Sequence, residues 1–277
     1  MKLKFICLFI ILMTFIASPA FAELDLEQEV LIIPDTHNDK PYIWQVRRNP
    51  RDYELDMKHE KTGDNYKVTV SVLPKSGGKV ENLHVFIADR DLKTYEHVIP
   101  SPGSNGSYSF NYAPPFDARY RFEVAFQTAE GWVSFKKDIK LKAAVKTAVN
   151  QNRPDDRDYD VRVKFIPGKV YAEHVVTFLY EIWYKHQRVE DLEKIGGFDM
   201  QVGSWNENLR EFLYSTPKQN LGGPEVAVSL VFMSTGRHVV FSEFMHKGIK
   251  RRVEFDLNVY QEPEENGGIN TLQPSYY

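Results

Sequence analysis

Apolar and polar residues alternate through most of the chain after residue 50. Tyr53, Leu55 and Met57 alternate with polar residues, and the same period of two runs from Tyr66 to Val72 and from Tyr120 to Phe126. A period of two predicts half-buried β-strands. Gly and Pro fill the gaps and no amphipathic helix is convincing, so we predict an antiparallel β-sandwich of about 100 residues here.

The pattern then starts a second time. Arg51–Lys58 recurs as Arg157–Lys164, and Asp91–Tyr95 recurs as Asn208–Phe212. Anchors that return in the same order indicate an internal duplication. We therefore predict an all-β chain of two tandem immunoglobulin-like antiparallel β-sandwiches.

The duplication gives a domain map. The first sandwich is expected at residues 51–142 and the second at 158–260. Residues 143–157 have the composition of a linker, and residues 261–277 that of a flexible tail. Residues 23–50 are broken up by prolines, and we interpret them as a lead-in segment that packs on the first sandwich.

The first residues indicate export. Lys2 and Lys4 precede an apolar run, which is followed by the small-x-small sequence at 20–22. This is the pattern of a Sec-type signal peptide, so we expect residues 1–22 to be cleaved and the mature protein to be periplasmic or secreted. The single cysteine, Cys7, lies inside this segment. The mature chain is therefore expected to form no disulfide and to use no thiol chemistry.

Composition narrows the class of partner. The formal net charge is −3 and no long basic run is present, so neither nucleic acid nor an anionic membrane surface is indicated. No later segment approaches the roughly 18 apolar residues of a membrane-spanning helix. The 42% hydrophobic and 13% aromatic content is enough for well-filled cores. A protein is the expected partner, and the oligomeric state stays open.

The segment from His84 to Pro100 carries the candidate chemistry. Apolar residues flank a polar tip at Asp89-Arg90-Asp91, which predicts a β-hairpin. A turn centred between Arg90 and Asp91 would place His84 directly opposite His97, with Cβ atoms about 4.5 to 5.5 Å apart. Imidazoles at that separation could share a metal ion such as copper, zinc or nickel.

The spacing of these histidines resembles a known family. A His, a second His thirteen positions later, and then x-His-Pro before a closing strand is similar to YtkA-like immunoglobulin-fold modules of exported bacterial proteins, which are themselves similar to copper-resistance periplasmic proteins. The resemblance covers most of both repeats. It implies metal ligands at His84 and His97, but its third histidine falls on Ile99.

The second repeat departs further from this pattern. The resemblance places its three histidines on Gln201, Tyr214 and Thr216, none of which is a good transition-metal ligand. The hairpin frame is therefore expected to serve the fold in both copies, and any metal site to belong to the first.

Two ligands make a weak site, and tight binding would need a third donor. His59, Met57 and Glu96 qualify by residue type only, and Glu96 should point to the opposite face of its strand. The simpler interpretation is that His84 and His97 are surface or half-buried strand residues that stack against each other.

Other candidates have simpler interpretations. Asp35, His37 and Asp39 occupy alternate positions, as the ligands of a metal-binding loop do. They also fit a polar turn before Pro41, which is the simpler interpretation. A triad is suggested by residue type at three further positions: His238, Ser242 and Glu243. The first and last of these should face opposite sides of one strand, which leaves nucleophilic catalysis without geometric support.

One strand is aromatic on both faces. Phe178, Tyr180, Ile182 and Tyr184 share one face, and Trp183 lies on the other. Core packing on the first face and an inter-domain or partner contact on the second is the simplest account.

These observations favour an exported, non-enzymatic binding or accessory protein that mediates protein interaction. The alternative is a periplasmic metal-binding protein that holds copper or another divalent ion at His84 and His97. A third reading, a hydrolase on a sandwich scaffold, predicts that acidic residues such as Glu130, Asp138 and Glu225 cluster in a cleft.

Overall fold

The computed structural model describes residues 50–75, 79–103, 106–129, 131–144 and 158–261, with the backbone alone at 32–34, 41–43 and 47–48. These residues form several antiparallel β-sheets and contain no α-helix, which confirms the all-β prediction. The predicted signal peptide lies outside the described residues, as do nearly all of the linker and the tail and most of the lead-in segment. Over the described ranges, no helix has the length and apolar character needed to cross a membrane.

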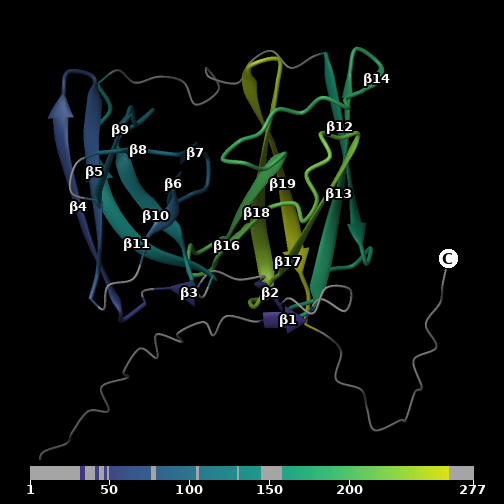
Figure 1. Cartoon of the computed structure of the whole chain (residues 1–277), viewed down its shortest axis with the longest axis horizontal. Helices are drawn as coiled ribbons and strands as arrows, with labels where there is room; N and C mark the ends of the chain where they lie inside the picture. Colours follow the sequence, from purple (N-terminus) through teal and green to yellow (C-terminus); the bar gives the residue numbers. More distant parts are fainter. Residues whose placement is uncertain are drawn as a thin grey trace, which may run out of the picture.

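The strands of the described chain fall into two sandwich-like units, which stand side by side in Figure 1. We call residues 50–144 the first unit and residues 158–261 the second unit. In each unit one sheet faces the other unit and is called the inner sheet. The remaining sheet is called the outer sheet.

The first unit contains two sheets. The strands of its outer sheet, in spatial order, are β4 (Tyr53–Thr62), β5 (Asn65–Pro74), β9 (Ser107–Tyr112) and β8 (Ser101–Pro102). The strands of its inner sheet are β3 (Arg47–Arg48), β11 (Gly131–Leu141), β10 (Ala118–Thr128), β6 (Glu81–Asp89) and β7 (Tyr95–Val98). Through β3, which runs parallel to β11, the lead-in segment joins the first unit. The other lead-in strands, β1 (Ile32–Pro34) and β2 (Pro41–Ile43), pair with each other.

The second unit repeats this arrangement. Its outer sheet consists of β12 (Tyr159–Ile166), β13 (Val175–Tyr184), β14 (Gln187–Arg188) and β17 (Glu225–Val231), which pairs with β13. Its inner sheet has the order β16 (Phe212–Ser215), β15 (Met200–Asn206), β18 (Gly236–His246) and β19 (Ile249–Val259). The inner-sheet order β7–β6–β10–β11 of the first unit is thus matched by β16–β15–β18–β19.

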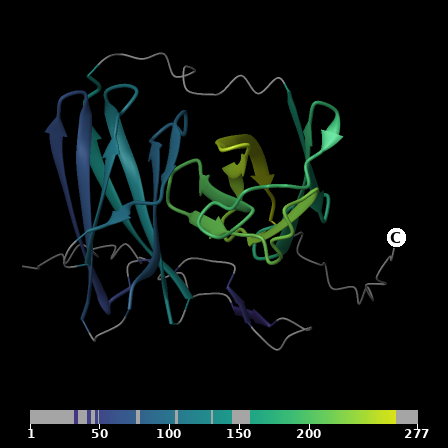
Figure 2. The ribbon, with the colours of Figure 1, turned by 45° about the horizontal axis from the view of Figure 1, so that its top comes forward.

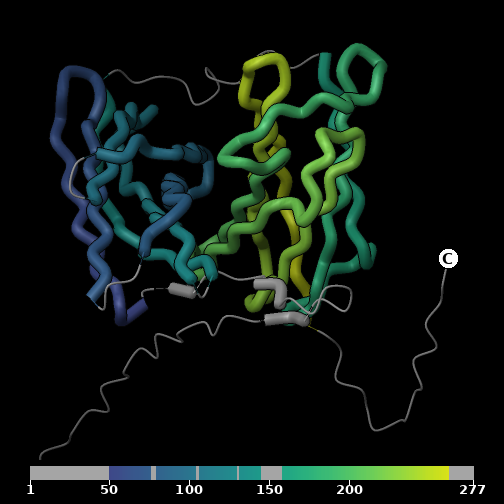
Figure 3. The backbone as a smooth tube through the Cα atoms, in the orientation of Figure 1, coloured from purple at the N-terminus to yellow at the C-terminus, as the bar shows by residue number. Residues whose placement is uncertain are grey.

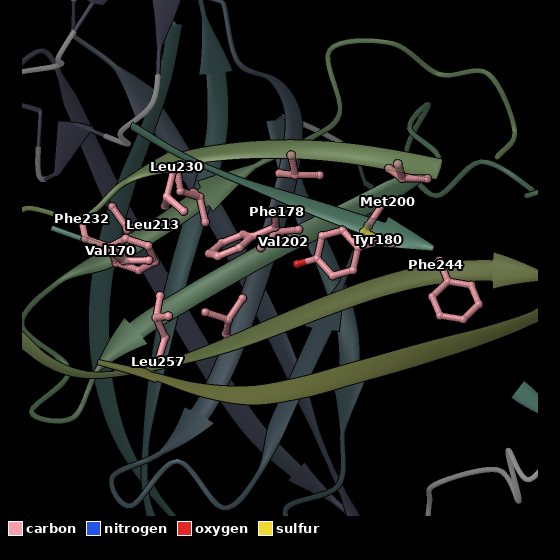
Figure 4. Packing of buried hydrophobic residues seen from close by; sticks show 14 of the residues in the cluster. Val170, Phe178, Tyr180, Met200, Val202, Leu213, Leu230, Phe232, Phe244 and Leu257 are labelled. Atoms are coloured by element: carbon pink, nitrogen blue, oxygen red, sulfur yellow. The ribbon is translucent and has the colours of Figure 1, made fainter. Parts of the chain in front are cut away.

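Each unit has its own core, filled by alternate residues of its strands. Tyr120, Phe122, Val124 and Phe126 of β10 are all buried in the first-unit core. In the second unit, the aromatic face of β13 packs against residues of the inner sheet such as Val202 and Phe244, as Figure 4 shows. Burying one such side chain contributes about 1.5–3 kcal/mol, so these stripes supply much of the stability of each unit.

The hairpin of β6 and β7 has a different register from the one predicted. Phe86, and not His84, lies opposite His97. The predicted tight turn does not form, because Leu92 adopts a φ of 55° and the Asp89 carboxylate accepts hydrogen bonds from the backbone N–H groups of Asp91 and Thr94. The register is therefore shifted by two residues. An even shift keeps both histidines on one face of the sheet.

The same hairpin occurs in both units. Gly203 lies opposite Tyr214, so each partner of the Phe86–His97 pair is reproduced 117 residues later. The loop is reproduced as well: Leu209 has a φ of 59°, matching Leu92. This is direct structural support for the duplication at the level of the hairpin.

The two inner sheets pack face to face, as two views show (Figures 1 and 2). A single buried apolar cluster joins them and includes Phe86, Tyr95, Trp205, Phe212 and Phe241. Aromatic rings cross the interface at short range, with the Tyr95 and Phe241 centroids 4.3 Å apart and stacked. The two units are thus held together by an apolar interface that resembles a third core.

Candidate functional site

His84 and His97 lie inside the interface between the units. They are 1% and 3% exposed, although the sequence suggested surface or half-buried positions. Nδ1 of His84 is 2.9 Å from Nε2 of His97, and the rings stack with centroids 5.1 Å apart. His84 and His97 are therefore diagonal neighbours on adjacent strands, and their imidazoles are in contact. The sequence had predicted closely spaced imidazoles, but from a pairing in which the two residues lie directly opposite each other.

The second unit supplies an acidic partner to this pair. Oε2 of Glu243, on β18, lies 2.6 Å from Nδ1 of His97. Lys250 contacts the other carboxylate oxygen at 3.2 Å and donates a hydrogen bond to the backbone carbonyl of His97 at 2.8 Å. Nδ1 of His97 therefore donates its N–H to the Glu243 carboxylate, and its Nε2 faces Nδ1 of His84.

Gln201 and Tyr214 close the other side of the pair. Tyr214 donates a hydrogen bond to Oε1 of Gln201 at 3.1 Å, and Gln201 donates to the carbonyl of Ile195 at 2.5 Å. The Tyr214 ring lies 5.5 Å from the His84 ring. Gly196, with a φ of 57°, covers His84, and an added Cβ there would lie 2.8 Å from Nε2 of Gln201. Figure 3 shows the loop before β15 reaching from the second unit toward the first.

Burial sets the protonation of this network. Desolvation, with the nearby His97 as a smaller cause, lowers the pKa of His84 to about 3, and a hydrogen bond with Gln201 offsets little of this. For Glu243, burial favours the neutral acid, but the hydrogen bond with His97 and the charges of His97 and Lys250 bring its pKa below the ordinary value. The arrangement is therefore a neutral His84 beside an ionised Glu243.

A metal site at these residues would have two protein ligands. Ile99 stands at the third position that the family resemblance requires. His59 and Met57 belong to β4 in the outer sheet, and Glu96 is exposed while its neighbour His97 is buried. Among the described residues, no group of three or more His, Cys, Asp or Glu side chains is placed to hold a metal ion. The residues present do not form a closed coordination shell.

The residues of the suggested triad belong to separate networks. His238 contacts Glu211 at 3.3 Å, Ser242 contacts the Tyr180 hydroxyl at 2.6 Å, and Glu243 binds His97. Each of the three side chains therefore has a different partner.

The acidic residues of the hydrolase reading are not brought together where they are described. Asp138, in the first unit, pairs with Arg121, and Glu225 is at the start of β17 in the second unit. Glu130 lies outside the described residues, as do Asp35, His37 and Asp39.

Trp183 lies on the outer sheet of the second unit, away from the interface. The guanidinium carbons of Arg162 and Arg188 are 5.3 and 5.2 Å from the centre of its ring. A cavity of about 370 Å³ adjoins it, lined also by Asp158, Asp160, Lys185 and His186. The sequence placed Trp183 on the face opposite the core, but the two arginines were missed because they come from different strands.

Glu243 and Lys250 were also missed as partners of the histidines. A local signal for Glu243 exists: it is a charged residue within the apolar run 239–244. The partner of Glu243 could not be predicted from that segment, because His97 is 146 positions away in the chain.

A family model described as a domain of unknown function (DUF8832) matches residues 154–261. The match covers the second unit and less than half of the chain. Among curated proteins, no sequence matches.

Several solved structures are similar to this chain at low identity. They include red sea bream transglutaminase (13% identity, 77% of this chain and 32% of that one, TM-score 0.24) and Salmonella alpha-2-macroglobulin reacted with methylamine (13%, 83% and 15%, TM-score 0.26). The BSP domain of a biofilm associated protein is 11% identical over 76% of this chain and 30% of that one, with a TM-score of 0.22. The chain spans about a third or less of the length of these proteins.

Proposed function

We propose that this is an exported, non-enzymatic protein of two immunoglobulin-like modules that binds another protein. The observation that carries the proposal is Trp183, held between the guanidinium groups of Arg162 and Arg188 on the outer sheet of the second unit. The histidine pair is engaged inside the inter-unit interface, which leaves this cluster as the leading candidate for external contact.

The chemistry of the Trp183 cluster supports a protein partner. Trp and Arg are enriched among the residues that dominate the binding energy of protein interfaces. Arginine stacked on an indole can still use its N–H donors. Arg162 donates to Asp160 in this way, and Arg188 can bind carboxylates or carbonyl groups of a partner. The adjoining cavity is large enough for one side chain of that partner.

The test is a photo-crosslinking residue in place of Arg188 in the full-length protein, produced in cells that export it. We expect a discrete adduct with a second protein, lost when Trp183→Ala is added. Arg237, an exposed arginine at the start of β18, provides the matched control position and should give no adduct. Equal labelling from both positions, or none from position 188, contradicts the proposal.

The alternative function is metal binding by His84 and His97, and one observation favours it. A histidine that binds a metal usually donates its other ring N–H to a carboxylate, and Glu243 holds His97 in that way. An ion bound to both imidazoles would have to replace the hydrogen bond between them.

Titration of the purified mature protein with Cu²⁺, followed by imidazole NMR signals, separates the two functions. Metal binding predicts micromolar affinity that is lost in both His84→Ala and His97→Ala and kept in His59→Ala, a change on the exposed strand β4. Affinity that is unchanged by the first two variants excludes the metal site.

A further inference from the structure

Equivalent residues of the two units meet at the centre of the interface. Phe86 and Gly203 occupy the same position in the two hairpins, and they lie against each other: a Cβ added to Gly203 would be 3.5 Å from Cδ1 of Phe86. Contact between equivalent positions is the mark of a two-fold arrangement. Here the arrangement is approximate, because the two residues differ in size.

Residue size also differs at a second pair of equivalent positions. Two positions after the Phe86–Gly203 contact, the first unit has the small Ala88 and the second has Trp205, and both are fully buried in the shared cluster. The larger residue is thus Phe86, in the first unit, at one pair of positions and Trp205, in the second unit, at the other. The two inner sheets therefore differ in residue size at both pairs of equivalent positions.

Polar groups are divided in the same way. Ala125 pairs with His84 on β10 and β6, and Glu243 pairs with Gln201 on β18 and β15, so Ala125 and Glu243 are equivalent. The carboxylate of Glu243 meets His97, whose equivalent is Tyr214.

On the other side of the axis, Tyr214 has an aromatic neighbour, whereas its equivalent His97 has charged neighbours. Trp132 packs edge-on against Tyr214 at 4.8 Å. The residue equivalent to Trp132 on β19 is Lys250, which binds Glu243. At these equivalent positions the contact is therefore ionic on one side of the axis and aromatic on the other.

We propose that the two inner sheets are a matched pair of interaction surfaces: the first-unit sheet binds the second-unit sheet and neither binds a copy of itself. The occupant of the second-unit inner sheet is the first unit of the same chain. This inference does not depend on a partner at Trp183.

Self-pairing fails for a physical reason in each case. Two second-unit sheets would place Gly203 against Gly203, which leaves a void, and would bury Glu243 without its histidine. Two first-unit sheets would place Phe86 against Phe86 in the space of one ring, and would leave His97 without a carboxylate.

The experiment uses the full chain with a protease site introduced within residues 145–157. After cleavage we expect the two pieces to stay together as a one-to-one complex in size-exclusion chromatography with light scattering. Separation of the pieces, or self-dimers of either piece, overturns the proposal.

Swapping the central residues tests the matching itself. Gly203→Phe should weaken the association of the cleaved pieces at least tenfold, and adding Phe86→Ala should restore most of it. Ala227→Phe, a small-to-large change at an exposed position of β17 in the outer sheet, is the matched control and should leave association unchanged. Circular dichroism checks that each cleaved variant keeps its strands. Full association of folded Gly203→Phe, or no rescue by the double variant, contradicts the matching.

Discussion

At the scale of single residues, the burial of His84 makes the stability of the folded protein depend on pH. Its pKa in the folded protein is about 3, against 6.5 for an ordinary histidine, because it is buried. Between these values the unfolded chain binds the proton and the folded chain does not, so stability falls as the pH is lowered. Glu243 acts in the same direction, because its depressed pKa gives stability that is lost when the carboxylate is protonated.

As the pH falls from 7 to 5, protonation of His84 in the unfolded chain is predicted to lower the free energy of unfolding by about 2 kcal/mol. His84→Gln, which installs the residue of the second unit, should remove that part of the slope. Urea denaturation at several pH values measures it. His59→Gln, on the exposed strand β4, controls for loss of a histidine as such. An unchanged slope in His84→Gln shows that His84 is not the buried neutral group inferred here.

Tyr95 carries a buried hydroxyl with no hydrogen-bond partner within the described part of the chain. Its equivalent in the second unit is Phe212, which packs in the same cluster without a hydroxyl. An unsatisfied buried polar group costs about 1–3 kcal/mol.

Tyr95→Phe is therefore expected to stabilise the protein by about 1 kcal/mol. Tyr180→Phe is the matched control, because the Tyr180 hydroxyl bonds Ser242 at 2.6 Å, and its removal should destabilise by a similar amount. Thermal unfolding of both variants measures the two effects. Destabilisation by Tyr95→Phe would show that the hydroxyl has a favourable partner.

At the scale of elements, the loop of each hairpin is held by one side chain at the end of its first strand. Asp89 accepts hydrogen bonds from the N–H groups of Asp91 and Thr94, and Asn206 accepts from those of Arg210 and Glu211. Both side chains replace backbone acceptors that a tighter turn would provide.

Asp89→Ala should destabilise the first hairpin by about 1–3 kcal/mol, because the part-buried N–H groups of Asp91 and Thr94 lose a charged acceptor. Asp89→Asn should cost much less, since Asn does the same work in the second unit. Hydrogen exchange at the Thr94 amide gives a local readout. Equal losses in both variants would mean that charge, and not the acceptor geometry, holds the loop.

At the scale of the whole molecule, the buried interface should couple the unfolding of the two units. A shared apolar cluster and the His97–Glu243 contact make separate unfolding expose buried surface on both sides. We expect one calorimetric transition for the wild type.

Glu243→Ala leaves His97 buried without its carboxylate, and removal of one partner of such a pair typically costs about 3–5 kcal/mol. The transition should move to lower temperature and separate into two. Glu225→Ala, an exposed change in the same unit, should leave a single transition near the wild-type temperature. A single unshifted transition in Glu243→Ala would show that the pair does not couple the units.

Local pattern was enough to predict many features. Alternation identifies strands because neighbouring side chains point to opposite faces, and β5 and β10 contain the alternating runs 66–72 and 120–126. The hairpin was recognised from its two apolar arms. Its register was not, since the loop conformation depends on the Asp89 side chain and on the positive φ of Leu92.

The sequence by itself determined the strands, the repeated hairpin and the shared face of His84 and His97, because all three follow from periodicity within short segments. Only the tertiary structure decided what that face meets. Glu243, Lys250 and Tyr214 reach the histidines from the second unit, and Arg162 and Arg188 reach Trp183 from separate strands. Such contacts depend on how strands and sheets pack, and no local pattern in the sequence encodes which residues meet.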